Sequence, residues 1–129
     1  MAIEQNAAIV ISRKAESTLA TKQYTFVKAG SAGGCAAQTS QGGDSLGVLQ
    51  NSPVSGGTAV ILVYGISKLV MGGVVADGAD ITTGTAGKGE DAATSDSDYV
   101  LGKSLHGQAS VSSDKITAAI NCISNMLLP

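Results

Sequence analysis

Apolar and polar residues alternate in short runs along this chain, and glycine-rich stretches separate one run from the next. Alternation of this kind puts every second side chain on one face of a β-strand, and adjacent glycines supply the positive φ that tight turns require. The pattern predicts short strands at 7–12, 24–28, 35–38, 46–50, 58–66, 68–71, 74–75, 81–83 and 99–105. Many short strands with regular turn signals are typical of an antiparallel β-barrel or β-sandwich.

The strongest strand pattern lies at residues 58–66, and Gly65 predicts a bend after which residues 68–71 continue the strand. The last segment, residues 115–128, fits two patterns. Its apolar residues alternate as in a strand, but several of them are also spaced as on one face of a helix. Periodicity alone does not decide between the two.

A faint internal repeat favours the strand. Ile11-Ser12-Arg13 returns 55 residues later as Ile66-Ser67-Lys68, and Leu46-Gly47 returns at the same offset as Leu101-Gly102. A repeat of this size usually means that one supersecondary unit is used more than once. The repeat aligns residues 115–128 with the strong strand pattern, so we expect a strand there.

The repeat and the length of the chain together predict its organisation. Because 129 residues suit one domain, two units would share one small core. We expect an all-β fold, a small single-domain antiparallel β-barrel or sandwich over residues 9–129. Its pseudo-repeats would cover about 9–65 and 66–129, and an extended N-terminal arm, residues 1–8, would precede them.

Composition predicts a weakly stable monomer. The chain contains 17 glycines, three tyrosines, one phenylalanine and no tryptophan, so valine, isoleucine, leucine and alanine must build the core. Small side chains each bury little apolar area, and burial stabilises by about 25 cal/mol per Å². Self-association, or docking on a larger body, would add the missing burial.

Charge argues against nucleic acid as a partner, and hydropathy argues against a membrane. The net charge of −2 is unfavourable for nucleic-acid binding. Residues 1–28 carry four basic and two acidic side chains, whereas the remainder carries four lysines and eight acids, which suits either solvated loops or a basic arm on an acidic body. The longest apolar run, residues 59–64, is far shorter than the ~20 residues that span a bilayer, so we expect no membrane partner. The N-terminus also lacks a signal-peptide pattern.

No group of residues predicts an active site, so we do not expect an enzyme. His106 is the only histidine, and it lies at a predicted turn without a nucleophile motif. Cys35 and Cys122 are far apart in sequence and are expected to be free thiols, with a disulfide as the alternative. One histidine and two cysteines are too few for a typical zinc site, and residues 91–98 lack EF-hand spacing. We therefore expect no catalytic, metal or cofactor site.

Residues 84–89 briefly suggest a phosphate-binding loop. If Gly87-Lys88 were its Gly-Lys pair, the motif would need glycine at 82 and serine or threonine at 89. The chain has Thr82 and Gly89 instead. The segment is better explained as the tip of a β-hairpin.

Several segments together resemble one protein family. They are YTFVK at 24–28, GVLQN at 47–51, VYGISK at 63–68 and DYVLG at 98–102, with Pro53, Gly56 and Gly72-Gly73 between them. In this order they resemble the capsid cement or head decoration proteins of tailed phages, a family whose members have been mislabelled as RecA-like recombinases. The failed phosphate loop argues independently against the recombinase label. After Asn121 the chain departs from the family pattern, which has a closing strand rich in valine and leucine.

The resemblance implies a structural virion protein on the outer surface of an icosahedral head, assembled in the host cytoplasm. Such proteins commonly form trimers and connect neighbouring major capsid proteins, so the major capsid protein and further copies of the chain are the implied partners. We expect the arm to add as an edge strand to a capsid-protein sheet, with disorder as the alternative for a terminus. The arm residues concerned are Ala2, Ile3, Glu4, Gln5 and Asn6.

Two other functions remain open from the sequence. A receptor- or carbohydrate-binding β module would present exposed aromatic side chains, and this chain has four aromatic residues, mostly at strand positions. A β domain of a phage tail or baseplate is the other alternative.

Overall fold

The chain folds almost entirely into β-strands. The computed structural model describes residues 8–92, 98–106, 114–123 and 126–127, and no helix occurs in these ranges, so the predicted all-β fold is confirmed. The strands are β1 (Ile9–Lys14), β2 (Phe26–Ala29), β3 (Cys35–Ala37), β4 (Gly47–Leu49), β5 (Thr58–Val70), β6 (Asp80–Thr83), β7 (Gly89–Asp91), β8 (Tyr99–Val100), β9 (Gly102–His106), β10 (Lys115–Asn121) and β11 (Met126–Leu127).

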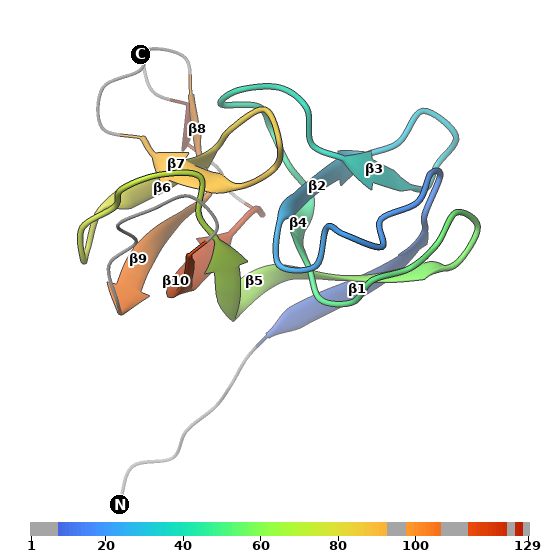
Figure 1. Cartoon of the computed structure of the whole chain (residues 1–129), viewed down its shortest axis with the longest axis horizontal. Helices are drawn as coiled ribbons and strands as arrows, with labels where there is room; N and C mark the ends of the chain where they lie inside the picture. Colours follow the sequence, from blue (N-terminus) through green and yellow to red (C-terminus); the bar gives the residue numbers. More distant parts are fainter. Residues whose placement is uncertain (1–7, 93–97, 107–113, 124–125, 128–129) are drawn as a thin grey trace, which may run out of the picture.

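Nine of these strands form one curled antiparallel sheet (Figure 1). Its order is β3-β2-β4-β5-β10-β9-β6-β7, and β1 pairs with β5 outside this path. Because β1 and β4 both pair with Ile61 and Leu62, they lie on opposite edges of β5. The short strands β8 and β11 pair separately.

The 13-residue strand β5 belongs to both halves of the molecule. Its first part pairs with β1 and β4, and its second part pairs with β10. Gly65 has a φ of 139°, which side chains rarely tolerate, so the bend predicted at this glycine is confirmed. Beside it the register against β1 shifts: Ile9 lies opposite Tyr64, whereas Val10 lies opposite Leu62. The extra residue, Val63, forms a β-bulge, which reverses the side-chain alternation along β5.

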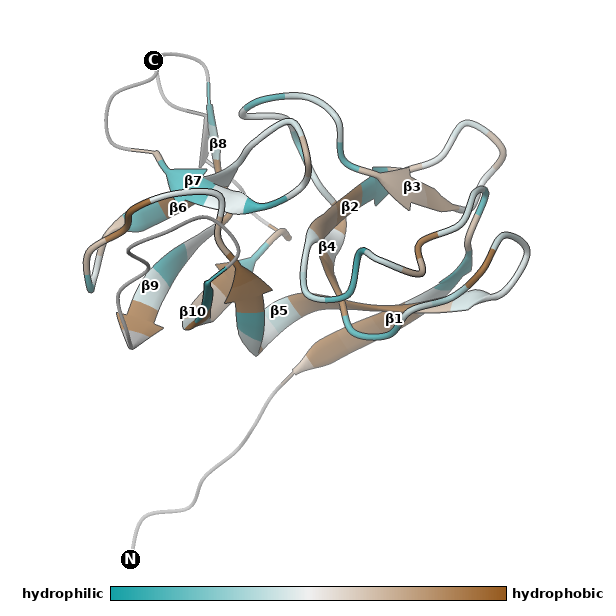
Figure 2. Cartoon of the chain, viewed as in Figure 1, coloured by the Kyte–Doolittle hydropathy of each residue, from teal (hydrophilic) through white to brown (hydrophobic). Residues whose placement is uncertain are grey.

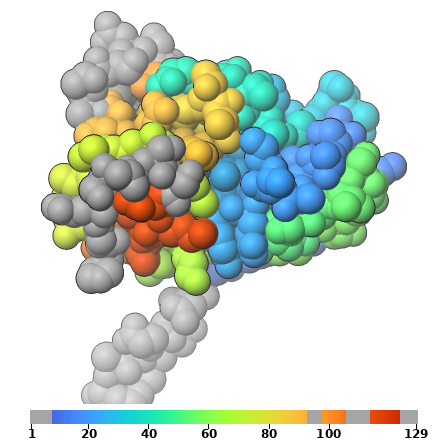
Figure 3. Space-filling model, viewed as in Figure 1, coloured from blue at the N-terminus to red at the C-terminus, as the bar shows by residue number. Residues whose placement is uncertain are grey.

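The two halves use the same pairing order. In the first half the pairs are β1–β5, β2–β3, β2–β4 and β4–β5; in the second they are β5–β10, β6–β7, β6–β9 and β9–β10. Each half also has one parallel bridge, Ala15 with Cys35 and Met71 with Gly89. Figure 3 shows the halves side by side, the first in blue to green and the second in yellow to red. The division at residues 65 and 66 stays a prediction, because β5 runs through it without a break.

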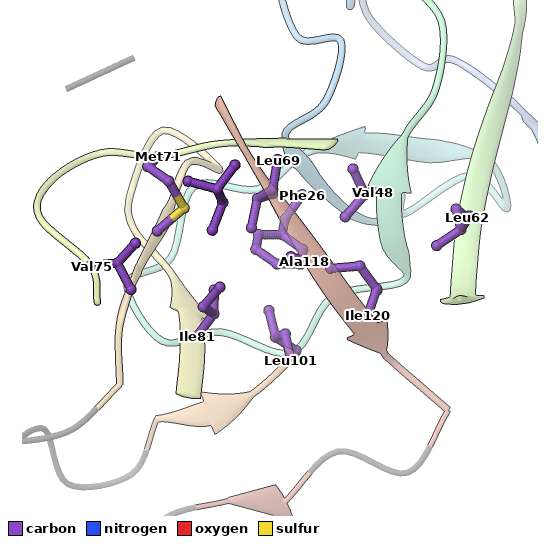
Figure 4. Packing of buried hydrophobic residues seen from close by; sticks show 11 residues of the cluster. Phe26, Val48, Leu62, Leu69, Met71, Val75, Ile81, Leu101, Ala118 and Ile120 are labelled. Atoms are coloured by element: carbon purple, nitrogen blue, oxygen red, sulfur yellow. The ribbon is translucent and has the colours of Figure 1, made fainter. Parts of the chain in front are cut away.

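Two cores lie on opposite faces of the first-half strands. Phe26 and Val48 point into one core and their chain neighbours Val27 and Leu49 into the other, as pleating requires. The first core contains Ala15, Leu19, Val27, Cys35, Leu49, Ala59 and Ile61. The second, drawn in Figure 4, contains Phe26, Val48, Leu62, Leu69, Met71, Val75, Ile81, Leu101, Ile116, Ala118 and Ile120. The second core therefore depends on side chains from both halves, which makes the chain one domain.

Three strand predictions need correction. The strand preference at the C-terminal end is confirmed for residues 115–121, but the strand ends at Asn121 rather than continuing to 128. The strand expected over 99–105 is interrupted at Leu101, which separates β8 from β9. The N–H of Leu101 donates to the carbonyl of Ile81 in β6. Residues 74–75 form no strand of their own: Val75 is buried in the second core and Val74 is exposed.

Candidate interaction surface

The residues considered for catalysis are dispersed. His106 is the last residue of β9 and pairs with Thr117 of β10, whereas Cys35 lies in the first core. Both cysteines are free, Cys35 in the first core and Cys122 against the second. Burial raises the pKa of the Cys122 thiol to about 12, and it also raises the pKa of Cys35, so both thiols are protonated at neutral pH.

The described part of the chain shows neither a metal-binding cluster nor a membrane-spanning helix. No group of three or more His, Cys, Asp or Glu side chains there is placed to hold a metal ion. Nor do these residues include a helix long and apolar enough to cross a bilayer.

Residues 84–89 form a hairpin tip, as predicted. Thr83 pairs with Gly89 across β6 and β7, the Gly84 N–H donates to the Lys88 carbonyl at 2.8 Å, and Gly87 has a φ of 77°. The glycines therefore serve the turn geometry.

The predicted arm residues, Ala2 to Asn6, lie outside the described residues. The described chain begins at Ala8, beside the bend in β5: a Cβ built on Gly65 would lie 3.2 Å from that of Ala8. The arm therefore joins the domain at the junction of the two halves.

Large apolar side chains are exposed around this junction. Ile9 is 46 % exposed, Tyr64 opposite it is 43 % exposed, and Ile66 is 62 % exposed in the middle of the sheet. Figure 2 shows the start of β1 in brown, whereas β5 alternates hydrophobic with pale and hydrophilic positions. Cross-strand partners lie on one side of a sheet, so these residues share a surface with side chains of β9 and β10. We call this surface the β5–β10 face; it consists of Ile9, Tyr64, Ile66, Lys68, Lys103, Lys115, Thr117, Ala119 and Asn121.

The neighbours on β10 explain why Ile66 and Tyr64 are uncovered. Ile66 lies opposite Ala119, and Tyr64 lies opposite Asn121, so each large side chain faces a small or polar partner. Ser67, the residue after Ile66, points inward and is buried. Exposed apolar groups gathered on one face, rather than scattered singly, are a usual mark of an interaction site.

Tyr24 borders this face in a strained conformation. Its φ is 65°, the one positive value for a residue other than glycine in the described chain. Its N–H donates to the Leu49 carbonyl at 2.7 Å, its carbonyl accepts from Val70 at 2.9 Å, and the Lys68 Nζ lies 5.8 Å from its ring centroid. These contacts hold the turn before β2 against the second part of β5. Strain of this kind persists where surrounding contacts impose it.

Charges are segregated between strands. The sequences of β1, β5, β9 and β10 contain five lysine or arginine residues and no acid, whereas β6 and β7 contain three acids and no basic residue. Lys103 and Asp80 meet at the boundary, with 3.3 Å between Nζ and Oδ1. The β5–β10 face is therefore apolar at its centre and basic around it.

Sequence reasoning did not find this surface. Tyr64 and Ile66 belong to an alternating run that reads as ordinary core, and only the bulge at Val63 turns them outward. The one feature of the sequence that points to this surface is the bend predicted at Gly65. It marks the position of Tyr64 and Ile66 but does not indicate that their side chains are exposed.

No family model and no curated protein match this chain. Among solved structures the fold is similar to the N base of head fiber gp8.5 of bacteriophage phi29, known from a crystal structure, with a TM-score of 0.65 and 17 % sequence identity. The similarity covers 89 % of this chain and 95 % of that chain, so nearly the whole of each shares one β fold.

Proposed function

We propose that this chain is a structural protein of a phage head. In this proposal it is a capsid decoration, or cement, protein: it binds the outer surface of an icosahedral head and stabilises contacts between major capsid proteins. The observation that carries the proposal is the fold similarity to a head fiber base over 89 % of this chain. The role needs surface complementarity and no catalytic residues, and the chain would act in the virion after assembly in the host cytoplasm.

The segments that resemble the decoration proteins support this role by their position. YTFVK leads into β2, GVLQN covers β4, VYGISK lies at the bend of β5, and DYVLG leads through β8 into β9. All but the last are strands around β5, and VYGISK contains the exposed Tyr64 and Ile66. The resemblance therefore includes both the central framework and the exposed surface.

The arm is proposed as the part that contacts the capsid. Residues 2–6 would add as an edge strand to a sheet of the major capsid protein, because main-chain hydrogen bonds bind an added strand with little demand on side chains. The position of Ala8 beside Gly65 supports this assignment, since it starts the arm at the edge of an exposed apolar surface.

Stabilisation of the head would follow from mass action. A protein that binds only the assembled lattice stabilises it by RT ln(1 + [L]/Kd), which is about 2.7 kcal/mol when the free concentration is 100 times Kd. Contacts with several capsid subunits at once add avidity, so each contact can be weak. A homotrimer would supply three such contacts.

The test is co-sedimentation of the purified chain with undecorated mature heads and, separately, with immature shells. We expect saturable binding to mature heads at a fixed ratio to the major capsid protein. A variant lacking residues 2–6 should bind less, and unchanged occupancy would remove the arm from the proposal. Absence of binding to both particles by the intact chain would overturn the capsid role itself.

A receptor- or carbohydrate-binding role is the second candidate, because Tyr64 offers an exposed aromatic ring in mid-strand. Sugar rings stack on such side chains. If the chain bound host-surface polysaccharide and not heads, and if Tyr64→Ala abolished that binding, this function would replace the first.

A further inference from the structure

The pairing order shared by the two halves assigns a structural counterpart to the β5–β10 face, with β1, β2, β4 and β5 equivalent to β5, β6, β9 and β10. In the first half, Phe26 on β2 pairs with Val48 on β4, which pairs with Leu62 on β5. In the second half the same pairing order places Asp80, Lys103 and Ala119 in one row across β6, β9 and β10, and Ile66 of β5 continues that row. The two rows are equivalent positions of the two units.

The first-half row is covered, and the second-half row is not. Phe26, Val48 and Leu62 are 0 %, 0 % and 6 % exposed, because the second unit of the chain packs over them. In the second half, Lys103 has a side chain 56 % exposed and Ile66 is 62 % exposed. In the first half this row is covered by the second half of the chain. In the second half the equivalent row, on the β5–β10 face, has no such cover among the described residues.

From these observations we infer that the β5–β10 face binds a second copy of this chain. The inference rests on the proposed self-association of a head protein, and it adds which surfaces meet. A further unit of the same fold is the occupant that the repeat favours. The change from Phe, Val and Leu to Asp, Lys and Ala at equivalent positions makes the contact wetter than a core, as in interfaces whose subunits also exist free.

Charge identifies the surface that the second copy contributes. Two copies of the β5–β10 face would oppose Lys68 and Lys115 to basic residues, with no acid from β5, β9 or β10 to offset them. The complement is the edge of the sheet formed by β6 and β7, whose sequences carry Asp80, Glu90 and Asp91 and no basic residue. Asp77 lies just before β6, and Asp80 meets Lys103 where this edge adjoins the β5–β10 face. The contact therefore joins two different surfaces.

A contact between different surfaces has a symmetry consequence. Such heterologous contacts generate a closed ring when the rotation closes, whereas a surface that pairs with itself gives a two-fold dimer. Ile66 and Tyr64 would form the apolar centre of each contact, and lysines and carboxylates its rim. This arrangement predicts a closed ring of three or more copies rather than an isolated two-fold dimer.

The first test measures self-association of the full chain without heads, by sedimentation velocity across protein concentration. Association should weaken between about 0.05 M and about 0.5 M salt, because screening shortens the reach of rim charges. Ile66→Asp should lower the association constant by roughly thirty-fold or more, the usual scale for a central residue. Val54→Asp is the matched control: Val54 is 62 % exposed like Ile66, lies in the first-half loop before β5 and should not alter association. Thermal unfolding of each variant verifies that it folds.

The second test separates a heterologous contact from face-to-face pairing. Ile66→Asp retains its acidic surface, whereas the double variant Asp77→Lys, Asp91→Lys retains its β5–β10 face. Each should fail to associate alone, and a mixture should form a one-to-one complex that grows no further. A mixture that stays monomeric would overturn the inference.

The outcomes also separate this inference from the capsid role. A wild-type chain that is monomeric at all concentrations, or an Ile66→Asp chain that associates like wild type, overturns the contact between copies. If Ile66→Asp instead reduced binding to heads while self-association stayed intact, the face would belong to the capsid contact, and the proposed function would stand without this inference.

Discussion

The two halves share a pairing order, but their strands are buried differently. β4 in the first half is buried at all three residues, and Phe26 and Val27 of β2 are buried on opposite faces. In the second half β10 alternates strictly, with Ile116, Ala118 and Ile120 buried and the residues between them partly exposed. β2 and β4 are thus enclosed on both faces, whereas β10 is enclosed on one. The same pairing order therefore encloses a central strand on both faces in one half and leaves one face of β10 open in the other.

The largest expected effect tests whether the halves fold together. Phe26→Ala should destabilise the chain by about 3–5 kcal/mol, because it empties a fully buried aromatic position that a first-half strand contributes to the second core. Chemical denaturation should give one transition, shifted as a whole. Val54→Ala, at a side chain 62 % exposed, is the control and should change little. Two transitions, of which one is unaffected, would mean that the halves are independent.

The junction between the halves should be the next most sensitive position. Gly65→Ala is expected to cost about 1–3 kcal/mol, because a φ of 139° strains any side chain and the added Cβ would contact Ala8. Gly73→Ala has open space and should be nearly neutral in the same denaturation experiment. Equal effects of the two substitutions would remove the bend as a requirement of the fold.

A smaller effect distinguishes the two equivalent hairpins. In the first half, Oε2 of Glu16 accepts hydrogen bonds from the N–H groups of Ala32 at 3.1 Å and Gly34 at 2.7 Å. Glu16→Ala should cost about 0.5–1.5 kcal/mol, since it removes the acceptor of one exposed and one part-buried amide. Amide hydrogen exchange should accelerate at Ala32 and Gly34 and stay unchanged in the hairpin at 84–88. Acceleration in both hairpins would indicate a global effect instead.

The smallest effect is expected at the boundary of the charged regions. Lys103 and Asp80 form an ion pair, but their side chains are 56 % and 52 % exposed, so solvent screens it. Asp80→Asn should change the free energy of unfolding by about 0–1 kcal/mol, measured at low and high salt. A loss well above that range would show that the pair organises the β6–β9 edge.

Much of the fold could be predicted from local patterns. The alternation at 58–66, the bend at Gly65 and the hairpin at 84–89 each depend on a few neighbouring residues, and all three are confirmed. The repeat also favoured a strand at 115–121 against a helical reading of the same residues, correctly. The strand expected over 99–105 failed because long-range bonding decided it: Leu101 donates to Ile81, which local sequence does not reveal.

The candidate surface could not be predicted, for a related reason. Whether Ile66 points inward or outward depends on the bulge at Val63, and the bulge is defined only by the register between β1 and β5. A shift of one residue moves a strand's side chains to the other face. The sequence of residues 58–70 is the same whether or not a bulge forms. Which face is exposed could therefore be known only from the pairing of β1 with β5. The predicted arm contact at residues 2–6 stays a prediction.

The shared strand β5 has a consequence for folding of the chain as it is synthesised. Val70 pairs with Lys115 and Tyr64 with Asn121, so one edge of β5 stays unpaired until residues 45 to 57 positions further along the chain have been made. Contacts so distant in sequence close slowly, and an unpaired apolar edge can associate with other chains meanwhile. The yield of folded protein in the cell should therefore depend on how quickly β10 is synthesised after β5. Slower translation of residues 71–121 should lower the amount of protein that reaches its native state.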